Sequence, residues 1–401
     1  MKNATLLIER SPGEIRAALL YGKEVWQVDH FRDNQKPLLG GIYNGRIRRI
    51  DQTMNAAFVD IGEKQDGFLR ARDATIQSPN RKRSNISQLV HEGQRITAKV
   101  IAEGFSGKGP RLILNKDKII DSQTKPSPSC VKLPPGAIDS ILQTYSKNLF
   151  KIICNDLTAK KTIQNWLSIN NTQNNITLIQ ENGPLFITYG VEESINQALS
   201  HRVAVNGGAE LVFDQTETLC AIDVNSSRQM GKAGKAARDI NLSVMKEISR
   251  QLRLRSIGGA IVIDALKMNR ANDRKQVLES LRNHIREDPS TSHVLGISNL
   301  GLIEMTRTRI GSTLAERMLE PPNTQILRSD VAAYNVIRHL LSESRVNPSA
   351  NYVLQISPEV ELILTEKLNM VFIEAASKIG RVKLQGMQNW SSDRCELIPI
   401  N

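Results

Sequence analysis

Two apolar runs of the sequence each end in Ile-Asp, and these acids are the residues best placed to do chemistry. The runs "TLCAID" and "AIVID" end at Asp223 and Asp264. The stretch between them has the length of one loop and one helix, so the second run can return beside the first. Both carboxylates would then emerge at one edge of a sheet, where they repel unless they share a cation or a proton.

Mg²⁺ suits such a pair, with Mn²⁺ as a substitute, because it binds one or two carboxylates and otherwise keeps waters and substrate phosphates. Asn225 lies on the same side of the extended chain as Asp223 and can orient its carboxylate. Cations that would neutralise a phosphate backbone follow: Arg228, Lys232, Lys235, Arg238, Arg250, Arg253 and Arg255. The pattern favours a metal-dependent phosphodiester site. The alternative is two capping or turn aspartates beside a solvated basic helix.

The elements around these acids can be predicted from the hydrophobic pattern. Residues 207–225 indicate two strands joined by the polar turn "DQTE". An amphipathic helix follows, since Ile240, Val244, Ile248 and Leu252 have the spacing of one helix face. Two glycines, Gly258 and Gly259, end it before the strand that leads to Asp264.

Composition narrows the class of protein. The length of 401 residues allows roughly two to four domains. The net charge of +12 favours a polyanionic partner, either nucleic acid or an anionic membrane surface. No apolar run reaches the length of a membrane span and no apolar leader is evident, which predicts a cytoplasmic protein without a membrane span. The four cysteines form no CxxC pair, so neither a disulfide framework nor a zinc knuckle is expected.

Turn residues divide the rest of the chain into segments with different predicted structure. Short strands at regular spacing over 40–116 predict a small closed barrel of the OB kind. Four prolines in 121–137 predict a linker, and 138–200 alternates helix and strand. Near the start, strand-like runs at 5–10 and 24–31 flank the more helix-permissive 13–22.

Several of these segments together carry a family resemblance. The stretches "GGAELVFDQTETLCAIDVNSS", "INLSVMKEISRQLRLRSIGGAIVIDALKM" and "LGLIEMTRTRIGSTL" closely resemble catalytic-domain signatures of the ribonuclease E/G family of bacterial endoribonucleases. The segments "IYNGRIRRIDQTMNAAFVDIGEKQDGFL" and "GPLFITYGVEESINQALSHRV" are similar to its other signatures. The resemblance covers most of the chain except the linker region. It implies that Asp223 and Asp264 hold Mg²⁺ and that Asn225 orients the first acid.

The resemblance also implies a role for the barrel, as an S1-type RNA-binding domain. Phe58 and Phe68 match positions that stack on unpaired bases, Lys108 matches a basic contact, and Tyr43 is a weaker match. Each base stacked on an aromatic ring contributes about 1–3 kcal/mol without demanding a sequence. The alternative is that both phenylalanines fill the barrel core.

The implied fold is a multidomain α/β protein. A discontinuous RNase H-like domain takes residues 1–36 and 137–200, with the S1-type OB barrel of 37–117 and a linker of 118–136 inserted into it. A DNase I-like catalytic domain spans 201–328, and a small C-terminal α/β domain spans 329–401.

The sequence departs from the family pattern in three places. The Gly-Arg-rich segment that senses an RNA 5′-monophosphate is missing, so we expect 5′-end sensing to be absent or rudimentary. The family's CxxC is replaced by "RMLEPPNTQILR", so neither zinc nor a zinc-linked dimer is expected. Lys267 stands where the family often has a further acid.

We therefore expect a Mg²⁺-dependent endoribonuclease that cuts single-stranded RNA, such as mRNA or rRNA precursors, leaving 5′-phosphate and 3′-hydroxyl ends. A metal-free route through the 2′-hydroxyl is disfavoured, because the six histidines form no evident acid–base pair. Two alternatives stay open: a catalytically degenerate RNA-binding protein of the same family, and a metal-dependent nuclease acting on DNA.

Overall fold

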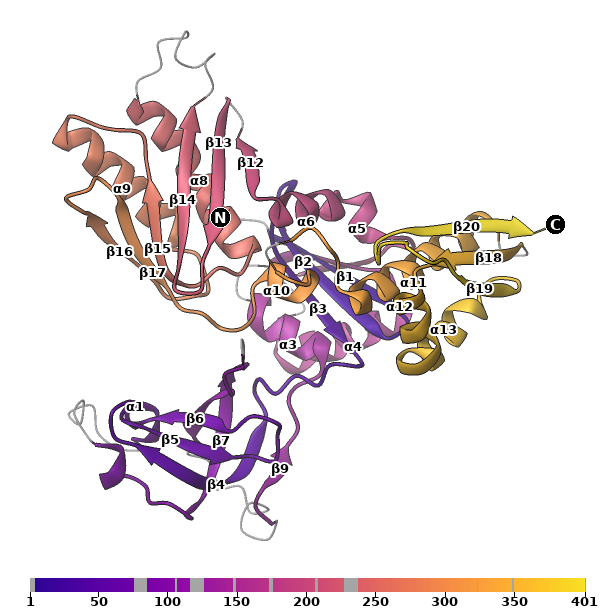
Figure 1. The fold of residues 1–401 in the computed structure, drawn as a ribbon, viewed down its shortest axis with the longest axis horizontal. Coiled ribbons are helices and arrows are strands. Elements are labelled where there is room, and N and C mark those ends of the chain that lie inside the picture. The colour runs from indigo at the N-terminus through magenta and orange to yellow at the C-terminus, as the bar shows by residue number, and fades with distance from the viewer. Residues whose placement is uncertain are drawn as a thin grey trace. The chain divides into compact units, whose positions relative to one another are not determined.

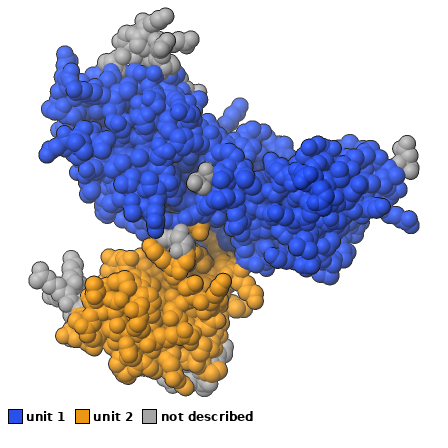
Figure 2. Space-filling view, viewed as in Figure 1, with its two compact units in different colours: residues 1–35, 141–309, 313–401 blue, residues 36–140, 310–312 orange. Residues whose placement is uncertain are grey.

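The computed structural model describes residues 4–75, 85–104, 107–115, 126–146, 149–172, 176–205, 208–226, 237–322, 324–347 and 350–400 (Figure 1). The chain forms two compact units. One consists of residues 1–35, 141–309 and 313–401, and the other of residues 36–140 and 310–312 (Figure 2). Both helices and strands are present, so the predicted mixed α/β class is confirmed.

The smaller unit is built around a closed five-stranded barrel. Its strands are β4 (Ile42–Asp51), β5 (Ala56–Asp60), β6 (Gly67–Arg70), β7 (Arg95–Ala102) and β8 (Arg111–Leu114). They pair in the order β5-β6-β8-β7-β4, and β4 pairs again with β5. This closure confirms the predicted OB-like barrel. Helix α1 (Ala71–Ala74) follows β6, and β9 (Ser129–Lys132), inside the stretch predicted as a linker, adds to β4.

In the larger unit, a five-stranded sheet joins two distant segments of the chain. The strands are β1 (Ala4–Ser11), β2 (Glu14–Tyr21), β3 (Glu24–Arg32), β10 (Leu149–Cys154) and β11 (Thr177–Gln180). Their order is β11-β10-β1-β2-β3, and β1 pairs with β10 in parallel. The larger unit also includes α4 (Leu157–Ile169), α5 (Leu185–Thr188) and α6 (Val191–Leu199), and the boundary between the units falls within α3 (Ala137–Tyr145).

Strand β2 corrects one expectation, since residues 13–22 were predicted to favour a helix. All four residues from Ala17 to Leu20 are at most 3% exposed. An inner strand covered on both faces lacks the alternation of a half-exposed strand and reads as a continuous apolar run. Gly13, with φ of +67°, supports the tight turn that pairs β2 with β1.

A six-stranded sheet carries the two candidate acids. Its strands are β12 (Arg202–Val205), β13 (Ala209–Gln215), β14 (Leu219–Ser226), β15 (Gly259–Asp264), β16 (Ser292–Ile297) and β17 (Ile303–Arg307), in the order β12-β13-β14-β15-β17-β16. Helices α8 (Ala237–Leu254) and α9 (Ala271–Ile285) share its hydrophobic core. The predicted helix face is confirmed, because Ile240, Val244, Ile248 and Leu252 are at most 4% exposed.

The C-terminal part packs helices on a three-stranded sheet. Its helices are α11 (Ser329–Val346), α12 (Pro358–Leu362), a π-helix (Ile363–Lys367) and α13 (Asn369–Ala376). The preceding helix, α10 (Leu314–Met318), instead shares the hydrophobic core of the first sheet. The strands β18 (Asn351–Ile356), β19 (Val382–Gly386) and β20 (Cys395–Ile400) pair in the order β19-β18-β20. Across the part of the chain that the structure describes, no helix has both the length and the apolar character needed to cross a membrane.

A buried charge network links the first sheet to α11. Arg32 Nε donates to Glu14 Oε1 at 2.8 Å, and Arg338 donates to the other oxygen of Glu14. Arg16, on the same strand as Glu14, donates to Glu9. Burial by itself would raise the pKa of Glu14, but the charges of Arg338, Arg16 and Arg32 lower that pKa to about 2. Glu14 is therefore a buried carboxylate that stays charged, and the neighbouring arginines compensate its negative charge.

Candidate active site and nucleic-acid interface

The two acids predicted to act together lie side by side. Strands β14 and β15 run parallel, and Asp223 is the register partner of Asp264. The preceding residues, Ile222 and Ile263, are at most 1% exposed and point into the core. Because side chains alternate along a strand, both carboxylates face away from that core, and both are exposed. The predicted placement at one sheet edge is confirmed.

Asn225 holds the first carboxylate directly. Its Nδ2 donates to Asp223 Oδ2 at 2.8 Å. The two residues are separated by one position on β14, so they project from the same face of the strand. This bond restricts the rotation of the Asp223 side chain, which is otherwise exposed to water.

A second amide, missed in the sequence, fixes the backbone that follows Asp264. Asn241 on α8 is fully buried, donates from Nδ2 to the Leu266 carbonyl at 2.8 Å, and accepts from the Leu266 N–H at 3.0 Å. The turn after β15 is thereby tied to the helix. The sequence could have identified Asn241, because this amide stands three residues before Val244 and seven before Ile248, on the predicted buried face of the helix.

The donor set of this site fits a hard divalent cation. Among the residues that the structure describes, no group of three or more His, Cys, Asp or Glu could hold a metal ion. A structural zinc site commonly takes four protein ligands, whereas Mg²⁺ needs one or two carboxylates and completes its shell with water and phosphate oxygens. Asp223 and Asp264 meet the second requirement. Lys267 is exposed in the turn after Asp264.

The seven basic residues predicted to surround the acids fall into three groups. Arg238 is partly exposed at the start of α8 and pairs with Asp239, at 2.7 Å between Nη2 and Oδ1. Arg228, Lys232 and Lys235 lie outside the described residues. Three others, Arg250, Arg253 and Arg255, were expected to face phosphate, and that expectation is wrong: each is at most 8% exposed.

These three side chains act instead as buried donors. Arg250 Nη1 donates to the Val25 carbonyl at 2.8 Å, and Arg253 Nε donates to Gln27 Oε1 at 3.1 Å. Arg255 donates to the backbone of Ser200. Their hydrogen bonds therefore tie α8, and Arg255 directly after it, to other segments, because a buried guanidinium must satisfy its N–H groups with protein acceptors.

On the barrel, Phe58 and Phe68 form an aromatic pair that lies outside the core. They are register partners on β5 and β6, and their ring centroids are 5.6 Å apart. Both side chains are half-buried, whereas their strand neighbours Val59 and Leu69 are fully buried. Tyr43, the weaker candidate, is 4% exposed and belongs to the barrel core, so its ring is not open to a base.

Lys108, the predicted basic contact, lies in the described segment between β7 and β8 and is exposed. The barrel therefore presents the two predicted phenylalanines and this lysine at its surface, while Tyr43 contributes to its interior.

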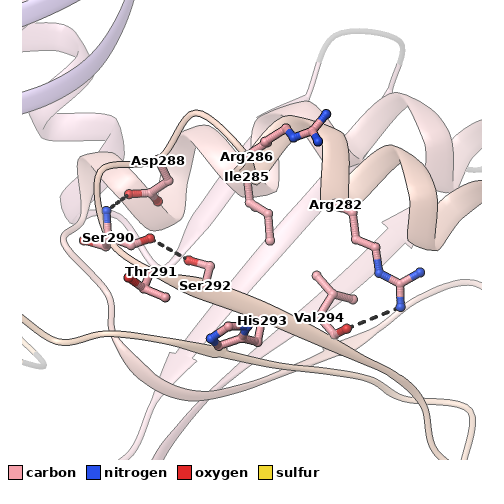
Figure 3. Close-up of a pocket in the computed structure, with 9 residues that line it drawn as sticks. All are labelled: Arg282, Ile285, Arg286, Asp288, Ser290, Thr291, Ser292, His293 and Val294. Atoms are coloured by element: carbon pink, nitrogen blue, oxygen red, sulfur yellow. Dashed lines mark hydrogen bonds between the residues drawn. The ribbon is translucent and has the colours of Figure 1, made fainter. Parts of the chain in front are cut away.

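The pocket in Figure 3 lies elsewhere on the six-stranded sheet that carries Asp223 and Asp264. It has a volume of about 470 Å³ between α9 and β16, and its residues include Arg282, Arg286, Ser290, Ser292 and His293. Ser292 is in register with Arg307, and Arg307 with Gly259, the first residue of β15. Asp264 is the last residue of β15, so the pocket is at the opposite end of the sheet from the acids.

Comparison with known proteins places these features in a family. The profile of the Ribonuclease E/G family matches residues 110–310. Ribonuclease G of Haemophilus influenzae is 25% identical over 489 aligned residues, covering 99% of this chain and 100% of that protein. Ribonuclease G of Escherichia coli K12 is 24% identical, covering 95% and 96%. Ribonuclease E of Buchnera aphidicola is 28% identical, covering 76% of this chain and 43% of its own length. With half of the chain matched by one family profile and nearly all of it aligned to Ribonuclease G, the protein belongs to the ribonuclease E/G family.

Proposed function

We propose that this protein is an endoribonuclease that cuts single-stranded RNA at the Asp223–Asp264 pair with Mg²⁺ as its cofactor. The observation that carries the proposal is the register of the two carboxylates, which form the last pair of the parallel ladder between β14 and β15. Membership of the family supports RNA as the substrate, and mRNA or rRNA precursors are the expected sources. The net charge of +12 suits a polyanion as well.

Each residue of the site has a distinct task in this proposal. Asp223 and Asp264 hold the cation, and Asn225 keeps the Asp223 carboxylate turned toward it through the bond at 2.8 Å. Mg²⁺, when bound, supplies an activated water and neutralises charge on the scissile phosphate. Lys267 adds a positive charge beside that phosphate. Attack by water on phosphorus, with the 3′-oxygen leaving, yields 5′-phosphate and 3′-hydroxyl ends.

The test is cleavage of an end-labelled, unstructured RNA in Mg²⁺, in Mn²⁺ and in EDTA. We expect internal cuts with either metal, none in EDTA, and products whose new 5′ ends lose phosphate to a phosphatase. If the protein binds the RNA but does not cut it with either metal, the proposed catalysis is refuted and only an RNA-binding function stands. Equal cleavage of single-stranded DNA would remove the assignment to RNA.

Replacing Asn225 with alanine is expected to lower the cleavage rate about ten- to a hundredfold and to raise the Mg²⁺ concentration needed for half-maximal rate. Groups that orient metal ligands typically contribute this much, because a freely rotating carboxylate binds less well. Initial rates across a Mg²⁺ titration measure both effects. Asn283→Ala, which changes an exposed asparagine near the C-terminal end of α9, is the matched control. Equal rates for the two variants would show that Asn225 has no orienting role.

A further inference from the structure

A third carboxylate lies on the sheet face that carries the two candidate acids. Strand β17 pairs with β15 on the side away from β14 (Figure 1). Ile303 and Met305 of β17 are at most 1% exposed and belong to the core. Because side chains alternate along a strand, Glu304 between them points to the opposite face, where it is partly exposed. Asp264 on β15 points to that same face.

Glu304 is a diagonal neighbour of Asp264. Its register partner on β15 is Val262, which stands two residues before Asp264. Diagonal neighbours in an antiparallel pair lie about 7–8 Å apart, a distance that long side chains can span. On its other side, the register partner of Glu304 is Gly296 of β16. Neither register partner offers Glu304 a polar side chain, and its carboxylate can reach toward Asp264.

On the other side of the site, Glu210 of β13 occupies the corresponding position. It stands two residues before Val212, the register partner of Asp223, and is therefore a diagonal neighbour of Asp223. Arg202 Nη1 donates to the Glu210 carboxylate at 2.6 Å. Glu304, in contrast, makes no hydrogen bond or ion pair with any residue that the structure describes. One flanking carboxylate is thus neutralised by a guanidinium, and the other keeps its full charge.

The resulting group of like charges favours a cation. Asp223, Asp264 and Glu304 have no countercharge paired with them among the described residues, and like charges on one face repel unless a cation is shared. Direct ligation by all three does not fit, because no three such groups in the described part of the chain lie close enough to hold a metal ion. Mg²⁺ bound by one or two carboxylates keeps several waters. These waters donate hydrogen bonds outward, and an acceptor at the distance of Glu304 suits them.

We propose that Glu304 binds the cation through its water shell, accepting hydrogen bonds from waters on the ion that Asp223 and Asp264 hold. The Glu304 carboxylate makes no bond to the ion itself. It adds negative charge to the site and fixes the orientation of the waters, so Glu304 is a positioning residue. The presence of the cation rests on the proposed function. The place of Glu304 beside it rests on the register of β15 and β17.

The test is Mn²⁺ binding by the full chain without RNA, followed by the loss of the electron paramagnetic resonance signal of free Mn²⁺. Mn²⁺ is a suitable probe because it takes the same oxygen ligands as Mg²⁺. Glu304→Gln keeps the shape of the side chain but removes its charge and makes it a weaker acceptor. We expect the dissociation constant for Mn²⁺ to rise about tenfold, as is typical when a partner beyond the direct ligands is lost.

Glu210→Gln is the matched control. It removes the same charge from the corresponding position on β13, where Arg202 already neutralises the carboxylate. Its dissociation constant for Mn²⁺ should stay close to the native value. Isotopically labelled water broadens the signal of bound Mn²⁺ according to the number of waters on the ion. That number should be the same in the native protein and in Glu304→Gln. Circular dichroism and thermal melting confirm that each variant folds.

Three outcomes would overturn the proposal: an unchanged dissociation constant in folded Glu304→Gln, an equal rise in Glu210→Gln, or an additional water on the ion in Glu304→Gln, which would indicate direct ligation. Failure of the proposed function has a different signature. If Asp264→Asn binds Mn²⁺ as tightly as the native chain, or if the native chain binds none, the cation site itself is refuted, whatever Glu304→Gln does.

Discussion

Asp223→Asn and Asp264→Asn should each lower metal-dependent RNA cleavage by a factor on the order of a thousand. A cation that stabilises transition-state charge contributes several kcal/mol, and each 1.36 kcal/mol is tenfold in rate. An amide keeps the shape of the side chain but removes one negative charge from the pair. Single-turnover rates at saturating RNA, measured across a Mg²⁺ titration, report the loss.

The double variant should be little worse than either single one, because the two carboxylates hold one cation as a unit. Asp214→Asn, at an exposed carboxylate on β13 of the same sheet, is the control and should keep the native rate. Neither substitution should lower the free energy of unfolding, since each removes one of two like charges that lie directly opposite each other in the sheet and are mildly destabilising. Full activity in either folded single variant would refute this pair as the metal site.

Glu14→Gln should lower the free energy of unfolding by about 3–5 kcal/mol. The substitution leaves the Arg32 and Arg338 guanidinium groups buried without their carboxylate, and breaking a buried ion pair on one side typically costs this much. Urea unfolding followed by tryptophan fluorescence measures the change. Glu396→Gln, at the exposed pair with Arg394, should change the free energy of unfolding by less than about 1 kcal/mol.

The same carboxylate predicts a dependence of stability on pH. The pKa of Glu14 is lowered from 4.5 to about 2, so its contribution is fully present above the unfolded value and is lost as pH falls through the folded one. The native protein should lose about 3 kcal/mol between pH 4.5 and 2 from this group. Glu14→Gln should lack that part of the slope. Parallel acid-unfolding slopes for the two proteins would contradict this account.

The candidate acids could be predicted because local patterns determine their positions. Two apolar runs that each end in Ile-Asp, separated by one amphipathic helix, lead to parallel pairing, and parallel pairing brings Asp223 and Asp264 together. The position of Asn225 on the same face of the strand as Asp223 could be predicted from strand alternation alone. The barrel was also predictable, since turn residues recur at the spacing of short strands.

What could not be predicted depends on contacts between distant parts of the chain. From the sequence, Arg250 is expected at the surface, because its buried hydrogen-bond acceptor, the Val25 carbonyl, comes from a distant part of the chain. Strand β2 shows no alternation because neighbours cover both of its faces. Arg111 joins Phe68 only through the parallel pairing of β6 with β8, which the closure of the barrel creates. Charge and hydropathy patterns cannot supply such partners.

The interruption of the first sheet has a consequence for how the chain is made. Leu6, Leu7 and Ile8 of β1 pair with β10, but the ribosome must first synthesise the whole barrel region. At typical rates of synthesis, β10 emerges on the order of 10 s after β3. During that interval the β1 edge is open to pairing with other chains. The strands of the barrel emerge together, so the barrel can close first, and the oldest part of the nascent chain completes its sheet late.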